Sequence, residues 1–434
     1  MSSFLIAAFS FAIMLCVLVF LHEWGHFLAA RLLGVRVEVF SVGFGRRIFG
    51  WKRGATEYRL SVLPFGGYVK MAGDSAFKPR TGSPDEFLSK SRWQRALIAT
   101  AGPAMNAITT VILFWISFSL IGVPYPAYLT RTASVAAVAE NSQTSDIRAG
   151  DVILAVNGTD TPNWDAVFVE ASKAAPESEL KLAVIRGGLQ STVMVMKREG
   201  DLSYLGYPLV QPRVDTVAAN TPAANAGLKA GDLVTSVNGD PLVTWPQFLD
   251  MLRESDIPDP AIVVLRGKKS VQLNISGLGG TDQGNDLLGA SPKLKHVYHR
   301  QGILMSARAA CMVTILLLRE IGDTFRGLFT TSISIRELQG VIGIAQQSGQ
   351  AATHGPAEFV DLMALISLNL GLLNLIPLPI LDGGQILILG LEGLFQRDLN
   401  LMVRQRFVQV SVIFLLALSA LAMFSDIQRI IRSY

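Results

Sequence analysis

Cysteine and charge are both scarce in this sequence. The chain has only two cysteines in 434 residues, Cys16 and Cys311, and neither belongs to a spacing typical of metal or redox sites. A disulfide-stabilised scaffold is therefore not expected. Charged residues make up only 17% of the chain and hydrophobic residues make up 50%. This balance is untypical of soluble enzymes and predicts an integral membrane protein.

Long apolar stretches give the number of membrane spans. Three stretches lack any charged residue, and a fourth contains only Asp382: 4–21, 96–123, 407–424 and 362–391. Each is long enough to cross a bilayer as a helix. A cleaved signal peptide is an alternative for the first stretch, but that stretch lacks a positive leader and a small-residue cleavage site. We therefore predict a polytopic α-helical membrane protein with four transmembrane helices, at residues 1–30, 96–123, 359–392 and 406–424.

The distribution of charge predicts the orientation in the membrane. Residues 31–95 hold 13 Lys and Arg against 5 Asp and Glu, whereas residues 131–299 hold 15 against 19. Because positive loops stay in the cytoplasm, we place 31–95 inside and the acidic insert in the periplasm of a bacterial inner membrane. The pI near 9 then follows from topology, and no nucleic-acid partner is expected.

The insert contains an internal repeat. IRAGDVILAVNG at 147–158 matches LKAGDLVTSVNG at 228–239, and each copy ends a mostly apolar strand at an Asn-Gly turn. Both copies resemble PDZ domains, which we place at 128–205 and 206–290. PDZ domains bind peptide termini by adding a strand to a sheet edge. A steric filter that binds no peptide is an equally open interpretation, and the first copy departs from the pattern by being two residues shorter.

The end of the first span carries HEWGH, residues 22–26. On a helix, His22 and His26 lie one turn apart and project from the same face, with Glu23 beside them. HExxH is the arrangement of zinc hydrolases, in which two imidazoles bind Zn²⁺ and the glutamate takes a proton from water. The pattern predicts a catalytic zinc site near the cytoplasmic side of the membrane.

A catalytic zinc ion needs a third protein ligand. The other three histidines, His296, His299 and His354, fall on the outer side in the predicted topology. Asp382 is the only charge in its apolar stretch, and it stands in NLIPLPILDGG, where prolines and glycines interrupt the helix. A buried carboxylate is stabilised beside a cation, so Asp382 is the predicted third ligand.

Together, HEWGH, GPAMN at 102–106, the tandem repeat and NLIPLPILDGG resemble the site-2 protease family of intramembrane zinc metalloproteases. The resemblance covers essentially the whole chain. It implies His22, His26 and Asp382 as zinc ligands and Glu23 as general base. It also implies substrates that are transmembrane helices already trimmed outside the membrane, such as an anti-sigma factor and signal peptide remnants. Gln385 departs from the pattern, because a histidine is expected after LDGG.

Cleavage of a helix within the bilayer requires local unwinding, and the freed backbone groups then need new partners. Alternating residues at 35–42 and 56–64 predict a β-hairpin that dips into the membrane within 31–95, with turn residues at 43–54 and a second turn at 64–71. The resemblance makes Gly43, Phe44 and Gly45 part of its substrate-binding edge. Asn369 and Asn374 are further candidates to hold the substrate backbone, although helix packing is an alternative for Asn369. Asn106 is interpreted as a packing residue.

Residues 291–358 are predicted to form an amphipathic linker on the outer membrane surface. A fifth span in 300–358 remains an alternative, and it would invert the third and fourth spans. A second function also remains open, namely a non-catalytic membrane scaffold whose PDZ domains bind peptides.

Overall fold

A computed structural model describes residues 3–74, 81–138, 146–198, 203–217, 221–253, 255, 257–277, 288–329, 340–397 and 401–433. The chain forms two compact units. One consists of Met1–Val123 together with Arg300–Tyr434, and the other is Pro124–His299. The second unit corresponds to the insert that the sequence predicts between the second and third spans.

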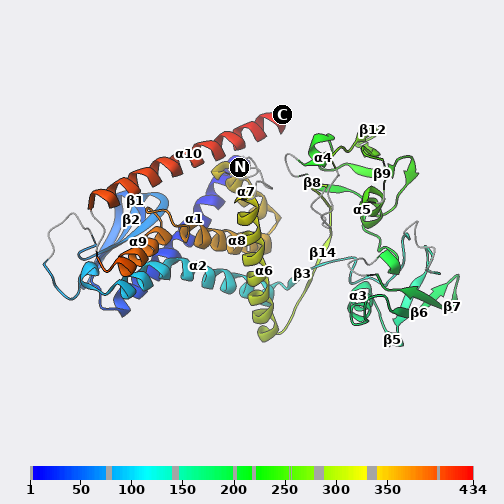
Figure 1. Cartoon of the computed structure of the whole chain (residues 1–434), viewed down its shortest axis with the longest axis horizontal. Coiled ribbons are helices and arrows are strands. Elements are labelled where there is room, and N and C mark those ends of the chain that lie inside the picture. Colours follow the sequence, from blue (N-terminus) through cyan, green and yellow to red (C-terminus); the bar gives the residue numbers. More distant parts are fainter. Residues whose placement is uncertain are drawn as a thin grey trace. The chain divides into compact units, whose positions relative to one another are not determined.

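Within the described residues, three helices are long and apolar enough to cross a membrane. They are α1 (Ser3–Leu32), α2 (Arg92–Leu120) and α8 (Pro356–Asn374), and they pack together with one another (Figure 1). The last helix, α10 (Leu401–Ser433), contains a shorter apolar part, Gln405–Leu421. Three of the four predicted spans therefore coincide with such helices, and the fourth stays a prediction.

Small residues and hydroxyl groups hold the three helices together. Gly25 lets α1 approach α2, because a Cβ there would lie 2.3 Å from the carbonyl oxygen of Ala101. Between α2 and α8, Thr110 Oγ1 donates to the carbonyl oxygen of Ala364 over 3.0 Å. Hydrogen bonds between helices and close small-residue contacts are the interactions that associate helices in lipid.

The third predicted span is broken, as its prolines and glycines indicate. Helix α8 ends at Asn374 and α9 (Asp382–Phe395) begins after a non-helical segment. The two glycines after Asp382 allow α9 to fold against that segment. A Cβ at Gly383 would lie 2.1 Å from the carbonyl oxygen of Leu375, and one at Gly384 would lie 2.1 Å from that of Leu378. The break thus places Asp382 at the N-terminus of a new helix.

The predicted hairpin exists, but its turn was placed wrongly. β1 (Val37–Arg53) and β2 (Thr56–Met71) remain paired as far as Arg53 and Thr56. Residues 43–53 therefore belong to the strand, and the tight turn lies at Gly54 and Ala55. Val39 to Val42 each have partners in both Glu57–Leu60 and Gly67–Lys70. β2 therefore folds back near Gly66, which has a φ of 106°. We call Gly67–Met71 the edge segment, since in the part of the chain that the structure describes it pairs only with β1.

The predicted linker contains two helices, α6 (Ile303–Phe329) and α7 (Val341–His354). Helix α6 packs on α2, where Trp115 Nε1 donates to the carbonyl oxygen of Ile303 over 3.0 Å. Small residues of α6 are buried, namely Ser306, Ala310 and Thr314. Helix α7 packs on α1 and α8. The segment thus contains two helices, and its amphipathic position on the membrane surface stays a prediction.

The two copies of the repeat fold alike, since each has a four-stranded sheet and a helix of nine residues. The first sheet has the order β5-β4-β6-β7 and the second β10-β9-β11-β12. The first copy comprises β4 (Val152–Val156), β5 (Thr159–Asp160), α3 (Trp164–Ser172), β6 (Glu179–Arg186) and β7 (Leu189–Met196). The second comprises β9 (Leu233–Val237), β10 (Asp240–Pro241), α5 (Trp245–Arg253), β11 (Ala261–Arg266) and β12 (Lys269–Asn274). The Asn-Gly turns form as expected, with φ of 51° at Asn157 and 50° at Asn238.

Shorter elements complete the insert. β3 (Val123–Pro126) pairs with β14 (His296–His299), and β8 (Val214–Val217) pairs with β13 (Ala290–Pro292). Helix α4 (Pro222–Asn225) belongs to the second copy. The corresponding stretch of the first copy, where the sequence is shorter, falls largely outside the described residues.

Each copy contains the same buried ion pair. Asp232 accepts hydrogen bonds from Arg266 Nε at 2.8 Å and Nη2 at 2.7 Å and from the backbone N–H of Lys229 at 2.9 Å. Asp151 accepts the equivalent bonds from Arg186 and from the N–H of Arg148. In each copy these bonds hold the pKa of the aspartate below its usual value, against the opposing effect of burial.

Replacing Asp232 with Asn is expected to lower the free energy of unfolding of the second copy by about 2–3 kcal/mol at neutral pH, because the guanidinium loses its buried partner. A lowered pKa in the folded state stabilises the fold above the unfolded pKa, and this contribution is lost as the pH falls through the folded pKa. The difference between variant and wild type should therefore shrink as the pH falls below the unfolded pKa of about 3.9, and it should vanish once the pH is below the lowered folded pKa. Hydrogen exchange of β9 in the full chain measures it, and an undiminished difference at low pH would contradict the assignment.

Candidate metal centre

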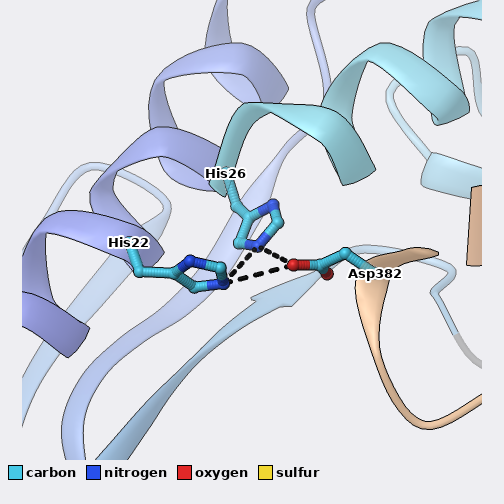
Figure 2. Close-up of side chains that lie close together, drawn as sticks. All are labelled: His22, His26 and Asp382. Carbon is cyan, nitrogen blue, oxygen red and sulfur yellow. Dashed lines mark hydrogen bonds and ion pairs between the residues drawn. The ribbon is translucent and has the colours of Figure 1, made fainter. Parts of the chain in front are cut away.

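His22 and His26 lie one turn apart on α1, and both side chains are buried. Figure 2 shows them extending toward Asp382, which comes from the start of α9. The Nε2 atoms of the two histidines are 3.2 Å apart. Asp382 Oδ2 lies 3.2 Å from Nε2 of His22 and 3.4 Å from Nε2 of His26. Residues 356 positions apart in the chain thus present three ligand atoms to one point.

Helix α2 supports both imidazoles through residues four positions apart. The Nδ1–H of His26 donates to the carbonyl oxygen of Ile98 over 2.8 Å, and His22 Nδ1 lies 3.2 Å from the side-chain amide of Asn106. Gly102 stands midway, and a Cβ there would lie 2.3 Å from His26 Nε2 and 2.8 Å from His22 Cε1. The four-residue spacing puts these groups on one face of α2, opposite the matching spacing on α1.

The three atoms fit a tetrahedral metal ion. Zinc binds imidazole nitrogen and carboxylate oxygen at about 2.0–2.2 Å, and tetrahedral geometry then separates neighbouring ligand atoms by about 3.3–3.5 Å. The observed separations are 3.2, 3.2 and 3.4 Å. Neutral His26 carries its proton on Nδ1, where it donates the hydrogen bond to Ile98, so His26 Nε2 presents a lone pair to the carboxylate. Asp382 Oδ2 is buried without a hydrogen-bond donor. Such a cluster of acceptors is stabilised by a cation.

A cavity of about 510 Å³ opens onto the three atoms. Glu23 lines this cavity next to the histidines, together with Gly67, Tyr68 and Val69 of the edge segment. A Cβ at Gly67 would lie 3.0 Å from Glu23 Cγ. The edge segment therefore runs directly beside Glu23, and both line the same cavity. The other lining residues of the cavity include Val19, Phe44, Gly66, Leu370, Asn374, Leu381 and Gln385.

The sequence also matches a known protein family over most of its length. Residues 10–418 match peptidase family M50. The chain belongs to this peptidase family. It is similar to "Regulator of sigma-E protease RseP" of Escherichia coli K12, with 32% identity over 99% of this chain and 100% of that protein. It is also 30% identical to "Protease RseP" of Yersinia pestis, over 99% of this chain and 100% of that one. A protein of Vibrio cholerae named as a zinc metalloprotease is 30% identical over 97% of this chain and 98% of its own length.

In this M50 peptidase, the predicted substrate-binding residues divide into two groups. Phe44 and Asn374 line the cavity, and Asn374 Nδ2 lies 3.4 Å from His22 Nε2. The Phe44 ring stacks on Tyr68 at an interplanar angle of 9°. Gly43, Gly45 and Asn369 are not among the lining residues. Asn369 is five positions before Asn374 on α8, so the two amides point from different faces of that helix.

Three residues of the M50 site were not predicted. Gly102 and Asn106 belong to GPAMN, which lies in an apolar span, and there glycine and asparagine are also typical of ordinary helix packing. Gln385 lines the cavity one turn after Asp382. The spacing of Gly102 and Asn106, which equals that of His22 and His26, is the signal that would have indicated a shared face.

Proposed function

We propose that His22, His26 and Asp382 hold the catalytic zinc ion of this intramembrane metalloprotease and that Glu23 is its general base. The observation that carries the proposal is the triangle of ligand atoms, whose sides of 3.2, 3.2 and 3.4 Å suit zinc. These three residues would hold the ion, which would supply Lewis-acid polarisation of the scissile carbonyl and a water that is nucleophilic at neutral pH. Glu23 accepts the proton of the attacking water and passes it to the leaving amine.

The substrate is an unwound segment of a transmembrane helix. Unwinding frees backbone N–H and C=O groups that must be paired again inside the membrane. The edge segment Gly67–Met71 offers such groups beside Glu23, and an extended peptide laid along it adds a strand to the sheet. Phe44, stacked on Tyr68, forms the wall that orients this peptide. Gly43 and Gly45 act indirectly, by giving the backbone the left-handed conformation at φ of 87° and 88°.

Asn374 donates a hydrogen bond to the substrate carbonyl at the point of cleavage, because its amide nitrogen faces the metal-binding atoms. Asn374→Ala is expected to retain zinc and to lower kcat about 10²-fold, as loss of one donor to a developing oxyanion does. Asn369→Ala is the matched control, since Asn369 is the same residue type on the same helix but outside the cavity. Equal losses in both variants would contradict the assignment to Asn374.

The four spans, the cytoplasmic side of the zinc site and the periplasmic PDZ pair complete the proposal. The opposite net charges of 31–95 and 131–299 support this topology. The shared strand order of the two repeats supports the interpretation as two copies of one domain. Because similar proteins are named as regulators of sigma-E, we propose an anti-sigma factor and remnant signal peptides as substrates, cut after their outer parts have been trimmed.

The experiment is cleavage of a synthetic single-span peptide by the purified chain in detergent. The wild type should cut it, a chelator should stop the reaction, and added Zn²⁺ should restore it. Cleavage that persists in the metal-free protein would contradict the proposal. A protein that binds PDZ ligands but never cuts any single-span peptide would favour the scaffold instead, although a scaffold gives no reason for Glu23 to line the cavity next to the ligands.

A further inference from the structure

We propose that Asn106 is a positioning residue. Its side-chain oxygen accepts a hydrogen bond from the Nδ1–H of His22, and this keeps the Nε2 lone pair of that histidine free for the metal. The inference rests on the zinc site proposed above. It assigns Asn106 a role toward the metal, beyond holding α2 against its neighbours.

Asn106 is fixed in place from several sides. Asn106 is completely buried. Its backbone carbonyl oxygen accepts hydrogen bonds from Thr110 Oγ1 and from Ser367 Oγ, both at 2.9 Å. Gly371 of α8 passes close by, since a Cβ there would lie 3.1 Å from Asn106 Cβ. These contacts hold the backbone of Asn106 in place, and its side-chain amide nitrogen lies 3.2 Å from His22 Nδ1.

The tautomer of His22 decides whether the site can bind metal. An imidazole that binds through Nε2 carries its proton on Nδ1, and that proton needs an acceptor. For His26 the acceptor is the carbonyl oxygen of Ile98, two turns before Asn106 on the same face of α2. For His22 the neighbouring group is the Asn106 amide, which can either donate or accept.

The side-chain oxygen of Asn106 indicates which orientation of the amide is needed, because it lacks a hydrogen-bond partner as the amide now stands. In the structure the amide nitrogen faces His22, and Oδ1 is buried with no hydrogen-bond partner. A half-turn about the Cβ–Cγ bond exchanges two ends of nearly the same shape. The oxygen then accepts a hydrogen bond from the Nδ1–H of His22. Both imidazoles now direct an Nε2 lone pair toward the point that Asp382 Oδ2 also faces.

Two substitutions of similar size separate acceptance from donation. Asn106→Asp keeps an acceptor toward His22 and forms the carboxylate–histidine–zinc arrangement, whereas Asn106→Leu offers neither acceptor nor donor. Competition with a chromophoric chelator measures the zinc Kd of the full-length protein in detergent. We expect the Leu variant to bind zinc about 10–100-fold more weakly than wild type and the Asp variant to stay within about threefold.

Phe114→Leu is the packing control, because Phe114 is buried two turns further along α2, in the apolar cluster that contains Ala364 of α8, and its side chain has no group that could hydrogen-bond to Asn106 or to a histidine. It should leave the zinc Kd unchanged. An Asp variant closer to Leu than to wild type, a Leu variant that binds zinc as tightly as wild type, or a Phe114→Leu loss equal to that of the Asn106→Leu variant would each overturn the inference. A wild type that binds no zinc would overturn the proposed function itself, and that result is distinguishable from all three.

Discussion

Glu23→Gln is expected to bind one zinc ion per chain and to cleave a single-span peptide about 10³-fold more slowly than wild type. Glutamine has almost the same shape as glutamate, but it cannot take a proton from water. The ligand atoms belong to His22, His26 and Asp382, so the metal should stay. Zinc content and single-turnover rates on the same preparation measure both quantities.

Glu358→Gln serves as the control for this variant, because Glu358 is half exposed at the start of α8 and pairs with His354. It should cleave at the wild-type rate. Two results would contradict the assignment of Glu23 as the general base. A Glu23→Gln rate within tenfold of wild type would place the base elsewhere, and loss of zinc would make Glu23 a ligand.

Gly102→Ala is expected to expel the metal and abolish cleavage. The added methyl group would lie 2.3 Å from His26 Nε2, which is closer than atoms pack, so the imidazole must leave its position. Alanine is a better helix former than glycine, so α2 itself should remain intact. With one of three ligands displaced, stoichiometric zinc binding is expected to be lost, which metal analysis of the purified variant measures.

Gly390→Ala is the matched control for Gly102→Ala. Gly390 is also a helical glycine, on the helix that begins with Asp382, and a Cβ there meets nothing within 4 Å. This variant should keep both zinc and activity. If Gly102→Ala bound zinc as wild type does, α2 would have to yield at this point, and the account of the α1–α2 face would be wrong.

The cluster of His22, His26 and Asp382 could be predicted from the sequence because the constraints on these residues are local or rare. A four-residue spacing on a helix fixes His22 and His26 on one face whatever the fold. Asp382 could be found because an isolated carboxylate in an apolar stretch needs a partner, and the prolines and glycines around it predicted the break that the structure contains.

The parts that could not be predicted depend on contacts between distant segments. Arg46 to Arg53 mix cations with large apolar residues and show no alternation, so they resembled a turn, although they form strand. Pairing of β1 with two parts of β2 is tertiary, and it creates the edge segment beside Glu23. The need for glycine at position 102 arises only from the packing of α1 against α2, because a Cβ there would collide with His26 and His22. The residues next to Gly102 in the sequence do not indicate this contact.

The central claim is that one zinc ion is held jointly by the end of α1 and the start of α9. Zinc per chain in wild type and in Asp382→Ala, both purified full length, tests this claim most directly. The account predicts one ion per chain in the wild type and near-complete loss in the variant, because a buried pair of imidazoles alone leaves the site without its anionic ligand. An Asp382→Ala protein that retained stoichiometric zinc with wild-type affinity would contradict it.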